Sequence, residues 1–167
     1  MTFYGSMSEE IVNSAKQQAN HLLEEYLHLR GLRLTAEREA IVDAIYDCEG
    51  HFAIEALSTL LEQRRFRVSL ATLYNNMEML VDAGLVWRHY FCSSVLYERS
   101  IGTQPHFHRI CMACGQAEDY FSERLAHHVG NARIRAFKTD YSHIYLYGIC
   151  TKCAAAQRRK NKKLLKQ

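Results

Sequence analysis

Two Cys-x-x-Cys pairs constrain this sequence more than any other feature. Cys111 and Cys114 form the first pair, and Cys150 and Cys153 form the second. Two intervening residues let both sulfurs of a pair turn towards one ion, and four thiolates suit tetrahedral Zn²⁺ at about 2.3 Å per bond. A four-sulfur shell leaves no coordination position open. The spacing therefore predicts a structural zinc site.

Other uses of paired cysteines are a redox dithiol, an iron–sulfur cluster or a catalytic zinc. A redox dithiol needs only one pair, usually within a βαβ pattern that is absent here. Zinc deaminases require an upstream His-x-Glu, which the sequence lacks. No Gly-rich phosphate loop or nucleophile elbow is present either, so we expect no enzyme activity. Cys48 and Cys92 fall outside the pattern and are expected to be ordinary thiols.

The composition is that of a globular domain, with 48% apolar and 23% charged residues. No apolar run is long enough to span a membrane. The first residues, "MTFYGSMSEE", lack the basic start and apolar stretch of a secretion signal. We therefore expect a cytoplasmic protein with no membrane partner, in which a reducing environment favours metal binding over disulfides.

The first half of the chain shows helical periodicity, followed by a change to period two. Thr35 and Ser69 are candidate N-caps, and Gly84 is a candidate helix stop. After Gly84, "LVWRHYF" and "VLYERS" are typical of two short strands separated by "CSS". Helices are expected over residues 8–30, 35–48, 53–65 and 69–84.

Helices followed by a hairpin predict a winged helix-turn-helix, with residues 69–83 entering the major groove and 85–99 as the wing. A generic small α/β bundle without a DNA role is the alternative. The segment "IGTQP" (101–105) is the expected hinge. Beyond it, β-rich stretches flank a helix-compatible piece, "SERLAHHVGN", which indicates a smaller α/β domain. The fold class is thus α+β.

The predicted domains are a DNA-binding domain at 1–100, the hinge, a dimerisation and metal-binding domain at 106–153, and a basic helical tail at 154–167. Residues 1–91 carry more acidic than basic side chains, whereas the tail contains no acid. A basic tail favours a polyanionic partner, although a merely solubilising tail is the alternative. Its cations are Arg158, Arg159, Lys160, Lys162, Lys163 and Lys166.

His106 and His108 alternate just before Cys111, so an extended strand would direct both imidazoles to one side. Two such imidazoles can begin a nitrogen and oxygen metal site, or can be a surface feature. At this point the chain resembles the ferric uptake regulator (Fur) family of metal-responsive bacterial repressors. The resemblance covers roughly residues 30–153 and is carried by "GLRLTAER", "SLATLYNNMEMLVDAGLV", "HFHRICMACG" and "YLYGICTKC", in that order.

The resemblance implies that the four cysteines hold Zn²⁺. It also implies a regulatory metal site spanning the hinge, taking Fe²⁺, Mn²⁺ or Zn²⁺. A metal held by both domains would restrict the orientations of the DNA-binding heads in a homodimer and favour operator binding. The implied regulatory ligands are His51, Glu98, His106, His108 and Asp119. Some family members have a third site, but its positions are here Pro105, Phe107, Ala126 and Ser142, so we expect that site to be absent.

The expected partner is double-stranded DNA with an AT-rich palindromic operator. By resemblance, a basic residue at Arg33 reaches the minor groove, and Asn75 replaces the family's usual arginine. Asparagine can pair with adenine but cannot neutralise a phosphate. Peroxide sensors of the family usually carry aspartate at the position of Glu98, which favours an iron-type regulator; a peroxide- or haem-responsive regulator is the alternative. The implied DNA contacts are Arg33, Ser69, Ala71, Thr72, Tyr74 and Asn75.

Overall fold

The computed structural model describes residues 9–91 and 94–164. The N-terminal residues 1–8, Cys92 and the tail's Lys166, about which the sequence made predictions, lie outside the described residues. The chain divides into two compact units. The first is Met1–Tyr90 with Val95–Thr103, and the second is Phe91–Ser94 with Gln104–Gln167. Within the described ranges, no helix is long and apolar enough to cross a membrane.

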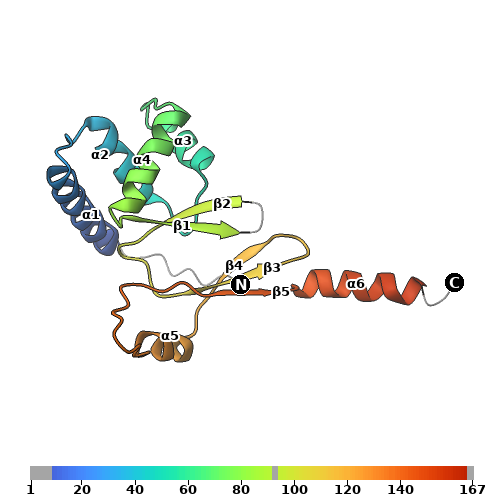
Figure 1. Ribbon diagram of the computed structural model, residues 1–167. Coiled ribbons are helices and arrows are strands. Elements are labelled where there is room, and N and C mark those ends of the chain that lie inside the picture. The colour runs from blue at the N-terminus through green and yellow to red at the C-terminus, as the bar shows by residue number, and fades with distance from the viewer. Residues whose placement is uncertain (1–8, 92–93, 165–167) are drawn as a thin grey trace. The chain divides into compact units, whose positions relative to one another are not determined.

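Four helices and a two-stranded hairpin make up the winged-helix part of the chain (Figure 1). Both predicted N-caps are confirmed, because the side chains of Thr35 and Ser69 accept hydrogen bonds from backbone N–H groups three residues on. The third helix ends two residues earlier than predicted, since Arg65 adopts a φ of 61°. The elements are α1 (Glu9–Leu29), α2 (Ala36–Asp47), α3 (Ile54–Gln63), α4 (Leu70–Asp82), β1 (Val86–Phe91) and β2 (Ser94–Arg99).

The apolar stripes of the four helices meet in one core, in which Leu23, Ile45 and Leu73 are fully buried. The base of the hairpin is tied to α2 by two buried hydrogen bonds. The Tyr46 hydroxyl donates to the Leu85 carbonyl at 2.9 Å, and the Arg99 guanidinium donates to the Tyr46 carbonyl at 2.7 Å. These bonds hold the end of β2 against the helical core.

Asp47 connects three segments of the first unit. It lies 2.7 Å from the Lys16 ammonium of α1 and 2.7 Å from the Arg64 guanidinium after α3. Partial burial raises the pKa of Asp47, but the hydrogen bonds from Lys16 and Arg64 outweigh it, so the pKa lies below its ordinary value. A carboxyl group with a lowered pKa stabilises the fold above its unfolded pKa of about 3.9, and that contribution is lost as pH falls through the folded value.

We expect Asp47→Asn to lower the free energy of unfolding by about 0.5–1 kcal/mol at pH 7, because the ion pairs are partly exposed. The difference from the unmodified chain should shrink as pH falls below about 4. Urea denaturation at pH 7 and pH 3 measures both effects. Asp43→Asn, at an exposed position of the same helix, is the matched control. Equal losses in the two variants would contradict a specific role for Asp47.

The second unit contains a three-stranded sheet in the order β4-β3-β5, with β3 antiparallel to β4 and parallel to β5. Residues 131–144, expected to be β-rich, form only an isolated bridge between Ile134 and Phe137. A parallel pairing needs a long crossover, and this segment supplies it together with the helix before it. The elements are β3 (Phe107–Cys111), β4 (Ala117–Tyr120), α5 (Glu123–Gly130), β5 (Tyr145–Gly148) and α6 (Thr151–Leu164).

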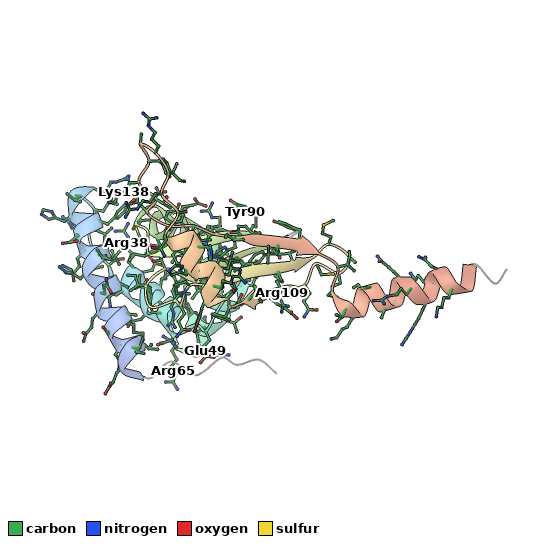
Figure 2. All side chains as sticks on the ribbon, turned by 90° about the horizontal axis from the view of Figure 1, so that it is seen from below. Arg38, Glu49, Arg65, Tyr90, Arg109 and Lys138 are labelled. Atoms are coloured by element: carbon green, nitrogen blue, oxygen red, sulfur yellow. The ribbon has the colours of Figure 1, made fainter. Side chains whose placement is uncertain are left out.

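Helix α6 begins before the predicted tail and includes Cys153 in its first turn. Residues 155–162 are all exposed, and their side chains project into solvent on several sides of the helix (Figure 2). The buried residues that the structure describes in the second unit are few: Phe91 of β1, and Phe107, His108, Ile110 and Cys111 of β3. The second unit therefore has a small core.

Candidate metal centres

The four paired cysteines come together in the second unit, where their four sulfur atoms all lie within 4.8 Å of one another. Cys111 ends β3 and pairs in register with Gly148 of the parallel strand β5, which brings Cys150 alongside it. Gly115, at φ 75°, completes the turn that carries Cys114. Cys153 follows in the first turn of α6. Strand pairing thus closes a cluster whose halves are far apart in the sequence.

Hydrogen bonds around the sulfurs favour the ionised thiol at Cys111 and oppose it at Cys153. The Cys150 N–H donates to the Cys111 sulfur at 3.3 Å, and this bond is the main cause that lowers the pKa of Cys111 to about 6. Hydrogen bonding to Cys150, and then to Cys114, raises the pKa of Cys153 to about 12. Four neighbouring thiols cannot all ionise without a compensating cation, and a divalent metal ion provides that charge.

This donor set fits zinc. Four sulfurs within 4.8 Å of one another, from two turns with N–H groups directed at them, suit a closed tetrahedral site. Cys48 lies apart at the C-cap of α2, where its thiol donates to the Ala44 carbonyl at 3.3 Å and burial raises its pKa. An ordinary, partly buried thiol is what the sequence predicted there.

Nitrogen and carboxylate donors form a second kind of cluster in the first unit. An antiparallel bridge joins Phe52 to Tyr97 through two backbone hydrogen bonds of 2.8 Å, and so sets His51 beside Glu98. The His51 Nε2 atom lies 3.6 Å from the Glu98 carboxylate oxygen Oε2. His89 of β1 reaches the same oxygen, with its Nε2 atom at 3.3 Å. The family resemblance implies His51 and Glu98 as ligands but not His89.

A similar cluster lies in the second unit, where the two alternating histidines meet Asp119. The His106 Nε2 and His108 Nδ1 atoms lie 3.8 and 3.6 Å from Asp119 Oδ1. His108 and Asp119 are directly opposed partners of β3 and β4, which explains the contact. The two imidazoles lie 4.8 Å apart between ring centroids. The expected same-side placement of His106 and His108 therefore holds within this unit.

The residues expected to contact DNA occupy an accessible part of the first unit. Ser69 caps α4, and Ala71, Tyr74 and Asn75 are exposed along its first two turns, with Thr72 half-buried between them. Leu73, Met77 and Leu80 bury the opposite side of the helix. Arg33 is exposed just before α2, and its carbonyl accepts a hydrogen bond from Arg38. Helix α4 is thus anchored in the core by its apolar side, and the side with the expected DNA contacts is accessible to solvent.

Comparison with known proteins identifies the family of this chain. The sequence model of the Ferric uptake regulator family matches residues 29–147 of the chain. The chain belongs to this family. Among curated relatives, the Bacillus subtilis peroxide operon regulator is 29% identical over 145 residues, covering 81% of this chain and 96% of the relative. The peroxide-responsive repressor PerR of Staphylococcus epidermidis is 29% identical over 147 residues, covering 82% and 93%.

Solved structures of the Fur family share the fold. The ferric uptake regulator of Pseudomonas aeruginosa with manganese superposes with a TM-score of 0.64 at 24% identity, over 77% of this chain and 97% of that one. The Vibrio cholerae ferric uptake regulator gives a TM-score of 0.56 at 27% identity, over 75% and 98%. The predicted α+β fold, with a winged-helix part followed by a small α/β part, is therefore confirmed.

Membership makes this Fur-family chain a metal-responsive regulator, in a family of dimeric DNA-binding transcription regulators that are not enzymes. The predicted cofactors, a structural zinc and a regulatory divalent metal, agree with the family and with the donor clusters. At the positions of the expected missing third site, Phe107 is buried in the strand core and Pro105, Ala126 and Ser142 offer no donor of the regulatory kind. The loss of that site stays a prediction.

Proposed function

We propose that this Fur-family chain is a homodimeric, metal-dependent DNA-binding repressor that controls the homeostasis of iron or a related metal. In this proposal the four cysteines hold a structural zinc. The observation that supports it best is the presence of a histidine and carboxylate cluster in each unit, at donor separations of 3.3–3.8 Å. The regulatory ligands would be His51, Glu98, His106, His108 and Asp119.

The proposed mechanism uses the position of these donors in the sequence. Glu98 precedes the hinge at 101–105, and His106 follows it directly. Donors on both sides of a short connection can bind one ion only when the two units adopt a restricted relative orientation. Metal binding would therefore select, from the orientations open to the dimer, those that fit two operator half-sites. Zinc at the cysteines would keep β3 rigid, so that His106 and His108 are presented together.

DNA reading is proposed for the exposed side of α4. Ser69, Thr72 and Tyr74 provide hydroxyl groups, and Ala71 provides a methyl group for contact with thymine. Asn75 can pair bidentately with adenine, which suits an AT-rich palindromic operator. Arg33, ahead of α2, would enter a narrow AT-rich minor groove with enhanced negative potential.

The direct test is a gel shift with the full chain on AT-rich palindromic DNA. Binding should be weak in metal-depleted buffer and should increase on addition of Fe²⁺ or Mn²⁺. Zinc content is measured in parallel, so that a loss of the cysteine site is not mistaken for a loss of the regulatory ion. Equal DNA affinity with and without added metal would reject metal-dependent repression.

A peroxide-responsive repressor is the second candidate, because the two relatives reported above are peroxide regulators at 29% identity. Glu98 favours the iron-type function, since peroxide sensors of the family usually have aspartate there. The two candidates differ in one experiment. If the chain is a peroxide sensor, brief hydrogen peroxide treatment should abolish DNA binding of the Fe²⁺-loaded protein and spare the Mn²⁺-loaded protein. An iron-type regulator should keep binding in both states.

The basic part of α6 is proposed to contact DNA phosphates. Replacing Arg158, Arg159, Lys160 and Lys162 with glutamine should weaken binding to all DNA sequences alike. Each lost phosphate contact should flatten the slope of log affinity against log salt by about 0.9. Affinity measured at several salt concentrations gives the slope. Arg135→Gln with Lys138→Gln, in the equally exposed crossover segment, is the control. An unchanged slope in the α6 variant would leave a solubilising role as the explanation.

A further inference from the structure

His89 is a buried histidine that the regulatory-ligand set does not include. Its side chain is 0% exposed, and Glu98 beside it is 2% exposed. The Nε2 atoms of His89 and His51 lie 3.3 and 3.6 Å from the same oxygen, Glu98 Oε2. The two imidazole rings meet edge to face, with centroids 5.0 Å apart. Two imidazoles thus converge on one buried carboxylate.

The two separations from Glu98 are those of ligands around an ion. Both exceed the usual 2.7–3.2 Å of an N–H···O hydrogen bond. Two donors bound tetrahedrally to one ion at about 2.1 Å lie roughly 3.4 Å apart, close to both values. Two histidines with one carboxylate are also the donor set of many non-haem Fe²⁺ sites. A divalent cation would neutralise a carboxylate that is costly to bury alone.

The arrangement is built by the first unit alone. The Phe52–Tyr97 bridge places His51 next to Glu98, and the pairing of β1 with β2 brings in His89. Hydrogen bonds from Tyr46 and Arg99 anchor the hairpin on the helical core. The three donors are therefore positioned by rigid strands and by backbone hydrogen bonds, as a preorganised ligand set requires.

We propose that His89 is a metal ligand, so that His51, His89 and Glu98 hold a divalent transition metal within the first unit. The inference rests on the proposed function and deepens its regulatory site. Together with His106, His108 and Asp119, the set becomes four imidazoles and two carboxylates. Six nitrogen and oxygen donors suit the octahedral preference of Fe²⁺ and Mn²⁺. Without the second-unit donors, the first unit keeps a weaker site of its own.

The first test counts imidazole ligands in the unmodified chain. Zinc fills the cysteine site, and Co²⁺ is added as the probe for the regulatory site. Each bound histidine contributes one exchangeable ring N–H signal shifted by the paramagnetic ion in the proton NMR spectrum. Four shifted signals are expected if His89 is a ligand, and three would overturn the inference. No substitution is needed, so misfolding cannot affect the count.

The second test compares His89→Gln with His21→Gln. His21 also pairs with a glutamate at a similar distance, 3.4 Å from Glu25, but both side chains are exposed on α1. His89→Gln should raise the Co²⁺ concentration for half-saturation by more than about 10-fold, since even outer-shell changes cost about 10–100-fold. It should also remove one shifted signal. His21→Gln should change neither, and an unchanged affinity in His89→Gln would overturn the assignment.

The paired variant His106→Ala/His108→Ala separates this inference from the proposed function. The structure predicts that it keeps weak Co²⁺ binding with two shifted signals, from His51 and His89. A further His89→Gln substitution should then abolish that binding. If the paired variant binds Co²⁺ as tightly as the unmodified chain, the shared regulatory site is wrong while the first-unit site stands. If it binds no Co²⁺ at all, the first-unit site is wrong and the proposed function is unaffected.

Discussion

Replacing Cys150 with serine is expected to unfold the second unit and to remove its zinc. The buried residues described in the second unit are Phe91 and four residues of the five-residue strand β3, so the hydrophobic contribution to stability is small. Binding of structural zinc to zinc-finger peptides contributes about 10–16 kcal/mol at pH 7, which exceeds what such a core supplies. Serine keeps the backbone N–H that Cys150 donates to the Cys111 sulfur, so the substitution removes the sulfur ligand alone.

Three measurements on the Cys150→Ser chain check this expectation. Zinc per chain should fall from one to nearly none, amide protection should be lost across β3 and β5, and the helices α1–α4 should keep theirs. Cys48→Ser is the matched control, because Cys48 is a thiol outside the cluster that donates to the Ala44 carbonyl of the preceding helix. Retained zinc with unchanged amide protection in Cys150→Ser would show that the four cysteines are not the structural site.

Local signals made the first half of the fold predictable. Thr35 and Ser69 were recognisable as N-caps because each precedes an apolar-periodic run, and their side chains make the expected bonds. Gly84, at φ 71°, ends the helix before the hairpin as expected. These features depend on residues three or four positions apart. The sequence contains that information directly.

Long-range pairing was not predictable in the same way. The parallel pairing of β3 with β5 joins residues about 37 apart, such as His108 and Tyr145, and no local pattern specifies the partner. The cysteine spacing did indicate that the two ends meet, because four thiolates need one ion. For residues 131–144 the β-branched and aromatic content predicted strands, but that content reflects a crossover whose apolar side chains are largely exposed.

His89 shows why part of the candidate metal site could not be predicted from the sequence. Period two in "LVWRHYF" places His89 on the same side of β1 as Trp87 and Phe91, where one histidine resembles a core residue. What gives His89 a metal-binding character is the proximity of Glu98 from β2 and of His51 from before α3. Neither neighbour is close in sequence. The one sequence signal for His89 was its position on the strand expected to pair with the strand of Glu98, an implied ligand.

Replacing both His106 and His108 with alanine is expected to remove the response of DNA binding to metal. Their imidazoles supply the nitrogen donors of the second unit, and Asp119 alone would remain there. Loss of two ligands should raise the Mn²⁺ concentration needed for half-maximal DNA binding by more than about 100-fold, since loss of a single outer-shell partner already costs about 10–100-fold. Fluorescence anisotropy of operator DNA during a Mn²⁺ titration measures the shift.

The crossover helix provides a matched control for this pair. His127 and His128 are also neighbouring imidazoles, with ring centroids 5.9 Å apart, but both are exposed on α5. His127→Ala/His128→Ala should therefore leave the Mn²⁺ titration unchanged. Zinc content should stay at one per chain in both paired variants, because the cysteine cluster uses other residues. A retained metal response in His106→Ala/His108→Ala, with zinc intact, would mean that the metal acts on DNA binding through the first unit alone. The three donors His51, His89 and Glu98 would then be sufficient for regulation.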